Sequence, residues 1–476
     1  MPIPAEILAV ERPKNTRVKK NGNKYDVIKR TCVRVNGKNV PKELGKIGEI
    51  VDGKYIPAKS SRLDFSLCDI KSFGRCEMAY MVSNNLFDEL CKIYNVDDAK
   101  RIYVISLLRS AYGGITNGDL KFRYETSYIS ERYKGIHIFP ASVSKFLDLL
   151  GRNYNKIKLF MVNRINSLDV KSKIIVDGML KDCNCDTSDF SKWSRKTRLK
   201  GSEDISILYA FDNLSGEPVA QRVYSGNTLD STSFDDFIEH FNLNNCLIMG
   251  DKGMINPDNF KKLNDTNRNL KYLFPLKRND SKVDKYKMLD FDTTIQVDND
   301  VLLAKKGVTE DGLFLYTFKS TDDEMKEKIG YLSNTIKNDS FELEKLQKKE
   351  KKFGIITFIS NQDLELKEIY KMYESRWEIE TFFNFYKNVA GLEDVRVQDN
   401  TSIIGSEFIN FLSSIISIRI KKEFIKANLY DKYSYNQIMD KLGLIDKYFD
   451  SSKNKWITTG KIKYVNDIAT SLKLDI

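Results

Sequence analysis

Residues 364–392, LELKEIYKMYESRWEIETFFNFYKNVAGL, decide the fold of this chain more than any other stretch, because they predict one long helix with a charged edge. At about 100° per residue, four of its side chains fall within a sector of roughly 60°. These are Tyr373, Arg376, Glu380 and Lys387. A neighbouring apolar stripe, wide enough to pack on a sheet, consists of Met372, Ile379, Phe382, Phe383 and Tyr386. Glu380 is therefore expected at the edge of the buried face, where a carboxylate is unfavourable unless it is paired or binds a metal.

Two aspartates at the predicted ends of buried strands favour a metal site. The run KIIVDG is predicted to end as a strand at Asp177, and NCLIMGD ends in Asp251. Ligands bind at the carboxyl ends of the strands in open α/β sheets. Two such aspartates and Glu380 on one sheet could therefore form an all-oxygen site for two divalent cations.

Ordinary structural roles are the alternative for each of these carboxylates. A single aspartate at a strand end is more often a turn or helix-cap residue. Arg376 and Glu380 are four residues apart, so they could also form an ion pair on a solvated helix face, which contributes only about 0.2–0.5 kcal/mol.

The composition restricts the chemistry that this chain can perform. Only 2 of its 476 residues are histidines, His137 and His240, so a histidine metal site or a Ser-His-Asp triad is improbable. The 7 cysteines are scattered, and the pair Cys183 and Cys185 has no matching second pair, which fits reduced thiols in a cytoplasmic protein better than zinc. Catalysis is therefore expected to use carboxylates and Mg²⁺, for which Mn²⁺ can substitute.

The charge and hydropathy of the chain indicate a polyanionic partner and no membrane. The formal net charge is +11, which fits nucleic acid without requiring it. The most apolar run, Phe408–Ile420, is interrupted by polar residues and is shorter than the roughly 20 apolar residues of a membrane span. The N-terminus shows no pattern of a secretory signal.

The order of predicted elements indicates a mixed α/β protein. Residues 1–62 contain the turn signals Asn21-Gly22, Asn36-Gly37 and Asp52-Gly53, which predict small hairpins. Helical patterns follow over 75–165, including PASVSKFLDLLGRN, which is predicted to begin at Pro140 and stop at Gly151. The next elements are predicted as three strands, a helix and two more strands, then β-like pieces over 280–352 before the long helix.

The motifs around the three carboxylates resemble those of one transposase family. The spacing Y-x2-R-x3-E-x6-K in the long helix resembles the C-terminal signature of the IS4 superfamily of DDE transposases. DGML at Asp177 and MGDKGM at Asp251 resemble the first and second catalytic aspartates of that family, and YSGNTLDSTSF is similar to a stretch between them. The long spacer before Glu380 resembles the β-rich insertion of its RNase H-like fold. The layout is most similar to the IS1634-like group, over roughly residues 165–278 and 353–425.

The resemblance implies an enzyme and a set of partners. A DDE transposase cleaves DNA at insertion-sequence ends and joins the freed 3′-hydroxyls to target DNA. Asp177, Asp251 and Glu380 would ligate two Mg²⁺ ions, while Tyr373, Arg376 and Lys387 would hold phosphates of the element's end. The partners would be double-stranded DNA, as terminal inverted repeats and target, and a second copy of the chain in the synaptic complex. We expect the protein in a prokaryotic cytoplasm, associated with the nucleoid when it acts.

The expected architecture is an RNase H-like mixed α/β sheet with a β-rich insertion, preceded by a small β region and a helical region and followed by a helical tail. The predicted domains are an N-terminal β-hairpin region (1–62), a helical and possibly DNA-end-binding domain (63–165), the first part of the catalytic core (166–279), an insertion subdomain (280–352), the second part of the core with the Glu380 helix (353–400) and a C-terminal helical region (401–476).

Further DNA contacts are predicted with competing structural roles. Trp377 could stack on an unpaired base or pack at the edge between helix and sheet. Arg198 and Lys200 belong to the basic stretch SKWSRKTRLKG, which could contact the DNA backbone or form a solvated loop. The helical region 75–165 could present a helix to the major groove or serve as scaffold.

Three other functions compete with the transposase. The first is another RNase H-like nuclease, such as a resolvase or an RNase, against which the helix signature and the long insertion argue. The second is a catalytically inactive, domesticated, sequence-specific DNA-binding protein, against which the three intact carboxylates argue. The third is a basic α/β protein with no nucleic-acid role, which would make the Tyr-Arg-Glu-Lys spacing a coincidence.

Overall fold

A computed structural model describes the chain except residues 1, 23, 36–37, 58–68, 184, 195–201, 244–245, 256–262, 264–269, 299, 339, 389–390, 393–394, 452, 460–461 and 476, and the side chains of residues 34, 35, 38, 377, 378, 380 and 388. The chain divides into two compact units, residues 1–69 with 449–455, and residues 70–448 with 456–476.

The first unit is a small antiparallel sheet with a short helix, α1 (Ala5–Leu8). Its four strands are neighbours in chain order: β1 (Thr16–Asn21), β2 (Lys24–Val35), β3 (Lys38–Val51) and β4 (Lys54–Pro57). Asp52 and Gly53 both adopt positive φ, which is the conformation of a tight two-residue hairpin turn. The predicted hairpins are confirmed, except that the Asn36-Gly37 turn lies outside the described residues. The core is small, formed by Val18, Val27 and Ile50.

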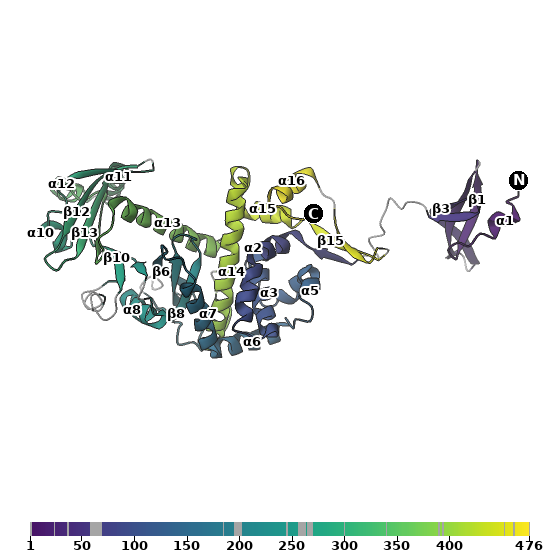
Figure 1. Ribbon diagram of the computed structural model, residues 1–476, viewed down its shortest axis with the longest axis horizontal. Helices are drawn as coiled ribbons and strands as arrows, with labels where there is room; N and C mark the ends of the chain where they lie inside the picture. The colour runs from purple at the N-terminus through teal and green to yellow at the C-terminus, as the bar shows by residue number, and fades with distance from the viewer. Residues whose placement is uncertain are drawn as a thin grey trace. The chain divides into compact units, whose positions relative to one another are not determined.

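A helical layer packs around one long helix, α14 (Asn400–Lys426), in the second unit (Figure 1). Its other helices are α2 (Gly74–Cys91), α3 (Val96–Tyr112), α4 (Leu120–Thr126), α5 (Ile129–Arg132), α6 (Pro140–Arg152) and α7 (Tyr154–Asn166). By length and composition α14 could cross a membrane, contrary to the expectation from its sequence. However, 89% of its most apolar window is buried inside the protein, as in the core helix of a globular fold.

Glycines set how closely α6 and α14 pack. The prediction that α6 stops at Gly151 is wrong, because the helix continues to Arg152. A Cβ atom at Gly151 would lie 1.8 Å from the carbonyl oxygen of Thr401, and one at Gly405 would lie 2.1 Å from that of Leu147. Both positions therefore require glycine for close approach rather than for a turn.

A nine-stranded mixed sheet forms the other layer, in the order β11-β12-β13-β14-β10-β9-β6-β7-β8. Its strands are β6 (Lys173–Asp182), β7 (Asp204–Asp212), β8 (Pro218–Ser225), β9 (Leu247–Met249), β10 (Lys271–Pro275), β11 (Thr293–Val297), β12 (Asp300–Val308), β13 (Phe314–Ser320) and β14 (Ile355–Ser360). β6, β7 and β8 are antiparallel, whereas β9 is parallel to β6 and β10 is parallel to β9. The predicted mixed α/β sheet is confirmed.

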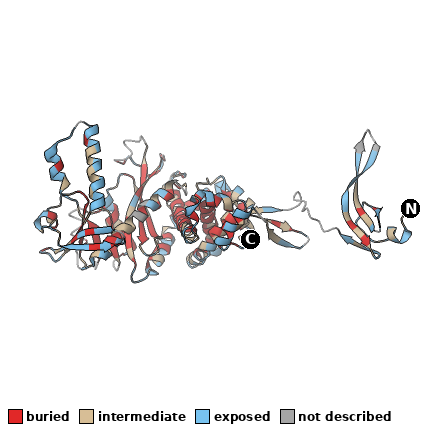
Figure 2. Ribbon diagram, turned by 90° about the horizontal axis from the view of Figure 1, so that it is seen from above, coloured by how far each residue is buried: buried red, intermediate tan, exposed pale blue. Residues whose placement is uncertain are grey.

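The β-like pieces within 280–352 extend this sheet, because β13 pairs with β14 and adds β12 and β11 beyond it. Three helices accompany them: α10 (Ser281–Lys285), α11 (Thr321–Lys337) and α12 (Leu343–Glu350). Figure 2 shows these helices largely exposed, whereas buried residues concentrate in the sheet and in α14. Helix α8 (Asp230–Phe241) packs on β7 and β8, and the predicted long helix is α13 (Leu366–Asn388).

The C-terminal region contains helices α15 (Tyr435–Leu442) and α16 (Lys463–Ser471) and two strands that the sequence pattern missed. β15 (Asp446–Asp450) and β16 (Lys455–Thr458) form a three-stranded sheet with β5 (Ile70–Ser72). This tail is therefore helical only in part.

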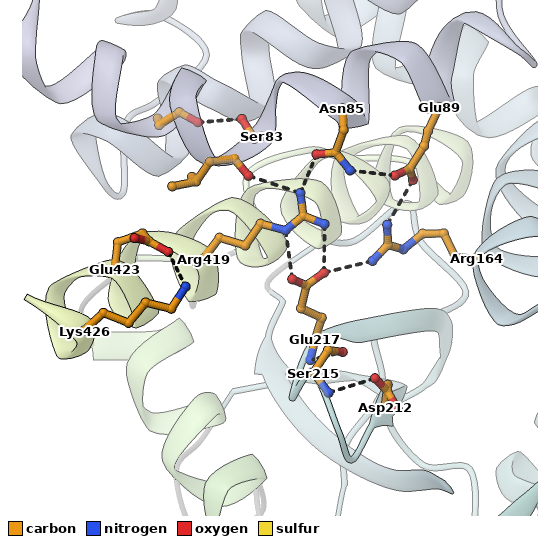
Figure 3. A network of polar contacts seen from close by, with 12 residues as sticks. Ser83, Asn85, Glu89, Arg164, Asp212, Ser215, Glu217, Arg419, Glu423 and Lys426 are labelled. Carbon is orange, nitrogen blue, oxygen red and sulfur yellow. Dashed lines mark hydrogen bonds and ion pairs between the residues drawn. The ribbon is translucent and has the colours of Figure 1, made fainter. Parts of the chain in front are cut away.

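A polar network joins the helical layer to the sheet (Figure 3). Arg419 of α14 donates two hydrogen bonds to Glu217 beside β8, at 2.8 and 2.9 Å, and one to Asn85 of α2 at 2.7 Å. Arg164 of α7 bridges Glu217 at 3.2 Å and Glu89 at 3.0 Å. Burial acts to raise the pKa of Glu217, but the hydrogen bond and charge of Arg419 lower it on balance.

Candidate active site

Asp177 lies inside strand β6, so the prediction that it ends the strand is wrong. β6 continues to Asp182 because its whole length pairs with β7, and Asp177 is the partner of Tyr209 in that register. The Oδ1 atom of Asp177 accepts a hydrogen bond from the backbone N–H of Gly178 at 2.8 Å. The carboxylate is half-buried.

Asp251 lies two residues beyond β9, which ends at Met249, so the prediction that this strand ends in Asp251 is wrong. β6 and β9 are parallel, with Ile175 paired to Met249. Asp177 and Asp251 each follow those partners by two residues, Asp177 within β6 and Asp251 in the segment after β9. Oδ1 of Asp251 accepts the backbone N–H of Lys252 at 2.7 Å.

Helix α13 covers the face of β6 on which Asp177 lies. Lys173 forms an ion pair with Glu368 of α13, and Ile175 lines a small cavity with Ile379 and Phe382 of the same helix. Lys181 contacts Tyr386 of α13, with its Nζ 3.4 Å from the hydroxyl oxygen. Alternate residues of a strand share a face, so Asp177 faces α13 as well.

Glu380 belongs to the part of α13 that packs over this strand. It follows Ile379 directly and precedes Phe382, and both of these residues line the cavity beside Ile175. The backbone of Glu380 is helical, and its side chain lies outside the described residues. The structure thus brings the predicted third carboxylate residue to the same face of the sheet as the two aspartates.

Arg376 connects α13 to Asp251. One guanidinium nitrogen lies 3.3 Å from Oδ1 of Asp251, and the two side chains are 18% and 37% exposed. Both residues line a cavity of about 530 Å³ between α13 and the sheet. Its other charged and aromatic lining residues are Lys252, Lys277, Arg278, Phe318, Asp323, Glu327, Tyr370 and Tyr373. Arg278 is itself paired with Glu327.

The other predicted DNA contacts have varied environments. The ring of Tyr373 packs edge-on against Phe358, with ring centroids 5.6 Å apart, and lines the cavity. Lys387 donates a hydrogen bond from Nζ to the backbone carbonyl of Leu180 in β6 at 2.9 Å. The backbone of Trp377 lies in α13, but its side chain and all of Arg198 and Lys200 lie outside the described residues. A DNA-binding role for these residues stays a prediction.

The donor set fits a hard divalent cation. The carboxylates of Asp177 and Asp251, which are both half-buried, have the oxygen ligands that Mg²⁺ prefers. Among the side chains that the structure describes, which do not include Glu380, no three His, Cys, Asp or Glu groups lie close enough to hold a metal. A metal site formed by Asp177, Asp251 and Glu380 therefore stays a prediction.

Sequence reasoning missed a buried polar group beside this site. Lys181 of β6 forms an ion pair with Glu407 of α14, and both side chains are fully buried. The available signal was a lysine and a glutamate within otherwise apolar stretches, MLKD and IIGSEFINF.

Comparisons with known proteins connect the chain to transposases. Residues 170–403 match the family model described as a transposase DDE domain. Among solved structures, a cryo-EM structure of a piggyBac transposase synaptic complex with hairpin DNA is similar, with a TM-score of 0.40 and 11% identity, over 84% of this chain and 85% of that one. A comparison with curated proteins finds no match. The matched family model spans Asp177, Asp251 and Glu380, and it supports placing this part of the chain in the DDE transposase family.

Proposed function

We propose that this protein is a DNA transposase that cleaves at insertion-sequence ends and joins the resulting 3′-hydroxyls to target DNA. The observation that carries the proposal is the parallel pairing of β6 with β9, since Asp177 in β6 and Asp251 after β9 each follow the paired residues Ile175 and Met249 by two positions. The match of residues 170–403 to the transposase DDE domain supports it independently. We also propose an RNase H-like core and membership of the IS4 superfamily, near its IS1634-like group, on the strength of the sequence motifs.

Asp177, Asp251 and Glu380 would hold two Mg²⁺ ions, for which Mn²⁺ can substitute. Such ions, when bound about 4 Å apart, activate the attacking oxygen and stabilise the leaving oxygen of a phosphodiester. The protein's own contribution is to orient these carboxylates from a rigid strand, a strand end and a helix. Arg376, beside Asp251, supplies a planar cation suited to a phosphate of the bound DNA.

The DNA partner would be the element's terminal inverted repeats and then the target duplex. Tyr373, Arg376 and Lys387 would contact phosphates near the cut, and Trp377, Arg198 and Lys200 would add further contacts. The net charge of +11 supports a polyanionic partner. We propose that a homodimer acts in the synaptic complex, because two ends must be brought together, and that it acts on the nucleoid of a prokaryotic cytoplasm.

A cleavage assay tests this function. Purified protein is incubated with DNA that carries the inverted repeats flanking its gene, with Mg²⁺ or Mn²⁺. We expect metal-dependent cuts at the repeat boundary that are lost in Asp177→Asn and Glu380→Gln while DNA binding is retained. Asp182→Asn on the same strand and Glu374→Gln on the same helix are the matched controls and should cleave normally.

Two results would contradict the proposal. Cleavage that persists in both variants would place the active site elsewhere. Binding to the repeats without cleavage under any metal would favour the inactive, domesticated DNA-binding protein instead.

A further inference from the structure

A buried charge pair joins three elements beside the candidate site. Nζ of Lys181 in β6 lies 2.7 Å from Oε1 of Glu407 in α14, and the two side chains are 0% and 1% exposed. The hydroxyl of Tyr386 in α13 donates to Oε2 of Glu407 at 3.2 Å and accepts from Lys181 at 3.4 Å. Asn410 donates to Oε1 of Glu407 at 3.1 Å. Burial raises the pKa of Tyr386 well above 10, so its hydroxyl keeps the proton that it donates.

A second contact lies next to the first one, between neighbouring residues of the same strand and the same helix. Nζ of Lys387 in α13 donates to the backbone carbonyl of Leu180 in β6 at 2.9 Å. Consecutive residues of the strand thus contact consecutive residues of the helix. We call the four residues that make these contacts the clamp: Lys181, Tyr386, Lys387 and Glu407.

The clamp lies close in sequence to two of the candidate metal ligands, within the same strand and the same helix. Lys181 follows Asp177 by four residues within β6, and Tyr386 follows Glu380 by six residues within α13. At the other end of the same interface, Lys173 pairs with Glu368. The strand segment with Asp177 and the helix segment with Glu380 are therefore fixed to each other from both sides.

Directional contacts suit this interface better than apolar packing alone. Apolar packing is less directional than a hydrogen-bonded charge pair, which has one favourable geometry. Productive sites hold their reactive groups within about 0.5 Å, so a small shift of α13 along β6 would separate the carboxylates. Burying two charges brings little net stability, which favours a role in positioning.

We propose that the clamp is a positioning device that sets the spacing between the Asp177 and Glu380 segments and thereby the affinity of the site for divalent cations. This inference rests on the metal site of the proposed function. It assigns to Lys387 a role in the protein interior besides contact with DNA.

Mn²⁺ binding without DNA, followed by the EPR signal of the free ion, tests the clamp. The variant Lys181→Met/Glu407→Leu removes both charges of this ion pair together, and the buried Arg109, which is linked to Glu407 through Asn410, keeps its hydrogen bonds to Asn410 and Asn117. We expect it to fold and to bind Mn²⁺ at least about tenfold more weakly, the size of effect typical of residues that orient metal ligands. Hydrogen exchange should be faster in the second half of α13, and saturating Mn²⁺ should restore cleavage.

The ion pair of Arg419 with Glu217 (Figure 3) supplies a matched control, because the hydrogen bonds described for these two side chains join α14 to α2, α7 and the turn before β8. Arg419→Met/Glu217→Leu should lower the melting temperature and leave the Mn²⁺ affinity within about twofold of the wild type, since additivity holds for distant sites. If Lys181→Met/Glu407→Leu fails to fold, Tyr386→Phe is the second variant, with an expected loss of Mn²⁺ affinity of about threefold.

The possible outcomes separate the clamp from the metal site itself. The clamp proposal would be overturned if the folded double variant, or Tyr386→Phe in its place, showed wild-type Mn²⁺ affinity and wild-type hydrogen exchange in α13. The proposed function would then be left intact. A wild-type protein that takes up no Mn²⁺ would overturn the proposed metal site, and the clamp with it.

Discussion

The guanidinium group of Arg376 lies 3.3 Å from the carboxylate of Asp251, so helix α13 holds a positive charge beside the aspartate that follows β9. In the absence of DNA and metal, this contact compensates the charge of Asp251 at the mouth of the cavity. A divalent cation that binds Asp251 must therefore compete with, or lie beside, the cation of Arg376.

Removal of this charge should strengthen metal binding to the protein alone. For Arg376→Gln we expect Mn²⁺ to bind about two- to fivefold more tightly in the absence of DNA, which corresponds to the roughly 0.5–1 kcal/mol of a partly exposed ion pair. The same variant should bind DNA more weakly, because a phosphate contact is lost. EPR titration and a gel-shift assay measure the two effects. Arg376→Lys, which keeps the charge, should restore the metal affinity of the wild type, and weaker Mn²⁺ binding by Arg376→Gln would contradict this explanation.

Close packing of α6 on α14 should make Gly151 intolerant of any side chain. A Cβ atom there would lie 1.8 Å from the carbonyl oxygen of Thr401, so Gly151→Ala must push the two packed helices apart. We expect the free energy of unfolding to fall by about 1–3 kcal/mol or more, as in other overpacked cores. Chemical denaturation measures the change.

Gly330 in α11 is the matched control for Gly151, because a Cβ atom at Gly330 meets no atom within 4 Å. Gly330→Ala should raise stability by up to about 1 kcal/mol through the higher helix propensity of alanine. Equal effects of the two substitutions would show that close packing does not determine the requirement for glycine at position 151.

Local patterns predicted the helix with Glu380 and most strands, but not where β6 ends. The dipeptide Asp177-Gly178 has the composition of a turn, yet Gly178 continues the strand beside Leu208 of β7, and a Cβ there would come within 2.7 Å of that side chain. The pairing partner that keeps β6 extended is far away in the sequence. A local window therefore predicts a turn where the sheet continues.

The relative position of the two strand segments also depends on long-range pairing. Each run predicted a strand by itself, but the parallel alignment of β6 with β9, with Ile175 opposite Met249, could not be predicted from either run. The same limit applies to the clamp, since Lys181 and Glu407 are separated by more than two hundred residues. Short strands such as β15 and β16 were missed because five or four residues carry too little periodicity.

The network around Glu217 should make a measurable contribution to stability. Arg419→Met removes two hydrogen bonds to Glu217, one to Asn85 and one to the backbone carbonyl of Val82, and leaves Glu217 its ion pair with Arg164. Hydrogen bonds to charged groups contribute about 1.5–3 kcal/mol each, and part of that loss is recovered by solvent, so we expect a decrease of roughly 2–4 kcal/mol in the free energy of unfolding. Arg419→Lys should recover only part of it. A loss below the error of denaturant titration would contradict this role.

The lowered pKa of His240 predicts how the free energy of unfolding depends on pH. Burial, and then the charges of Arg222 and Lys158, lower the pKa of His240 from 6.5 to about 4, against the opposing effect of Asp236. In the unfolded chain the pKa returns to about 6.5. Between these two values the unfolded chain binds more protons than the folded protein, so this group lowers the free energy of unfolding as the pH falls from about 6.5 towards 4. Above about 6.5 it has no such effect.

The comparison of wild type with His240→Gln isolates this contribution from the other titrating groups. The Nε2 atom of His240 lies 3.0 Å from the hydroxyl oxygen of Tyr154, and the glutamine amide can replace that hydrogen bond without titrating. We expect the wild type to lose more stability than His240→Gln when urea denaturation is measured at pH 5 instead of pH 7.5. The urea midpoint of the wild type should therefore fall further than that of the variant when the pH is lowered, which changes the gap between the two midpoints. A gap that stays constant over this range would mean that His240 does not titrate with a lowered pKa, because a histidine with an ordinary pKa contributes equally in both states.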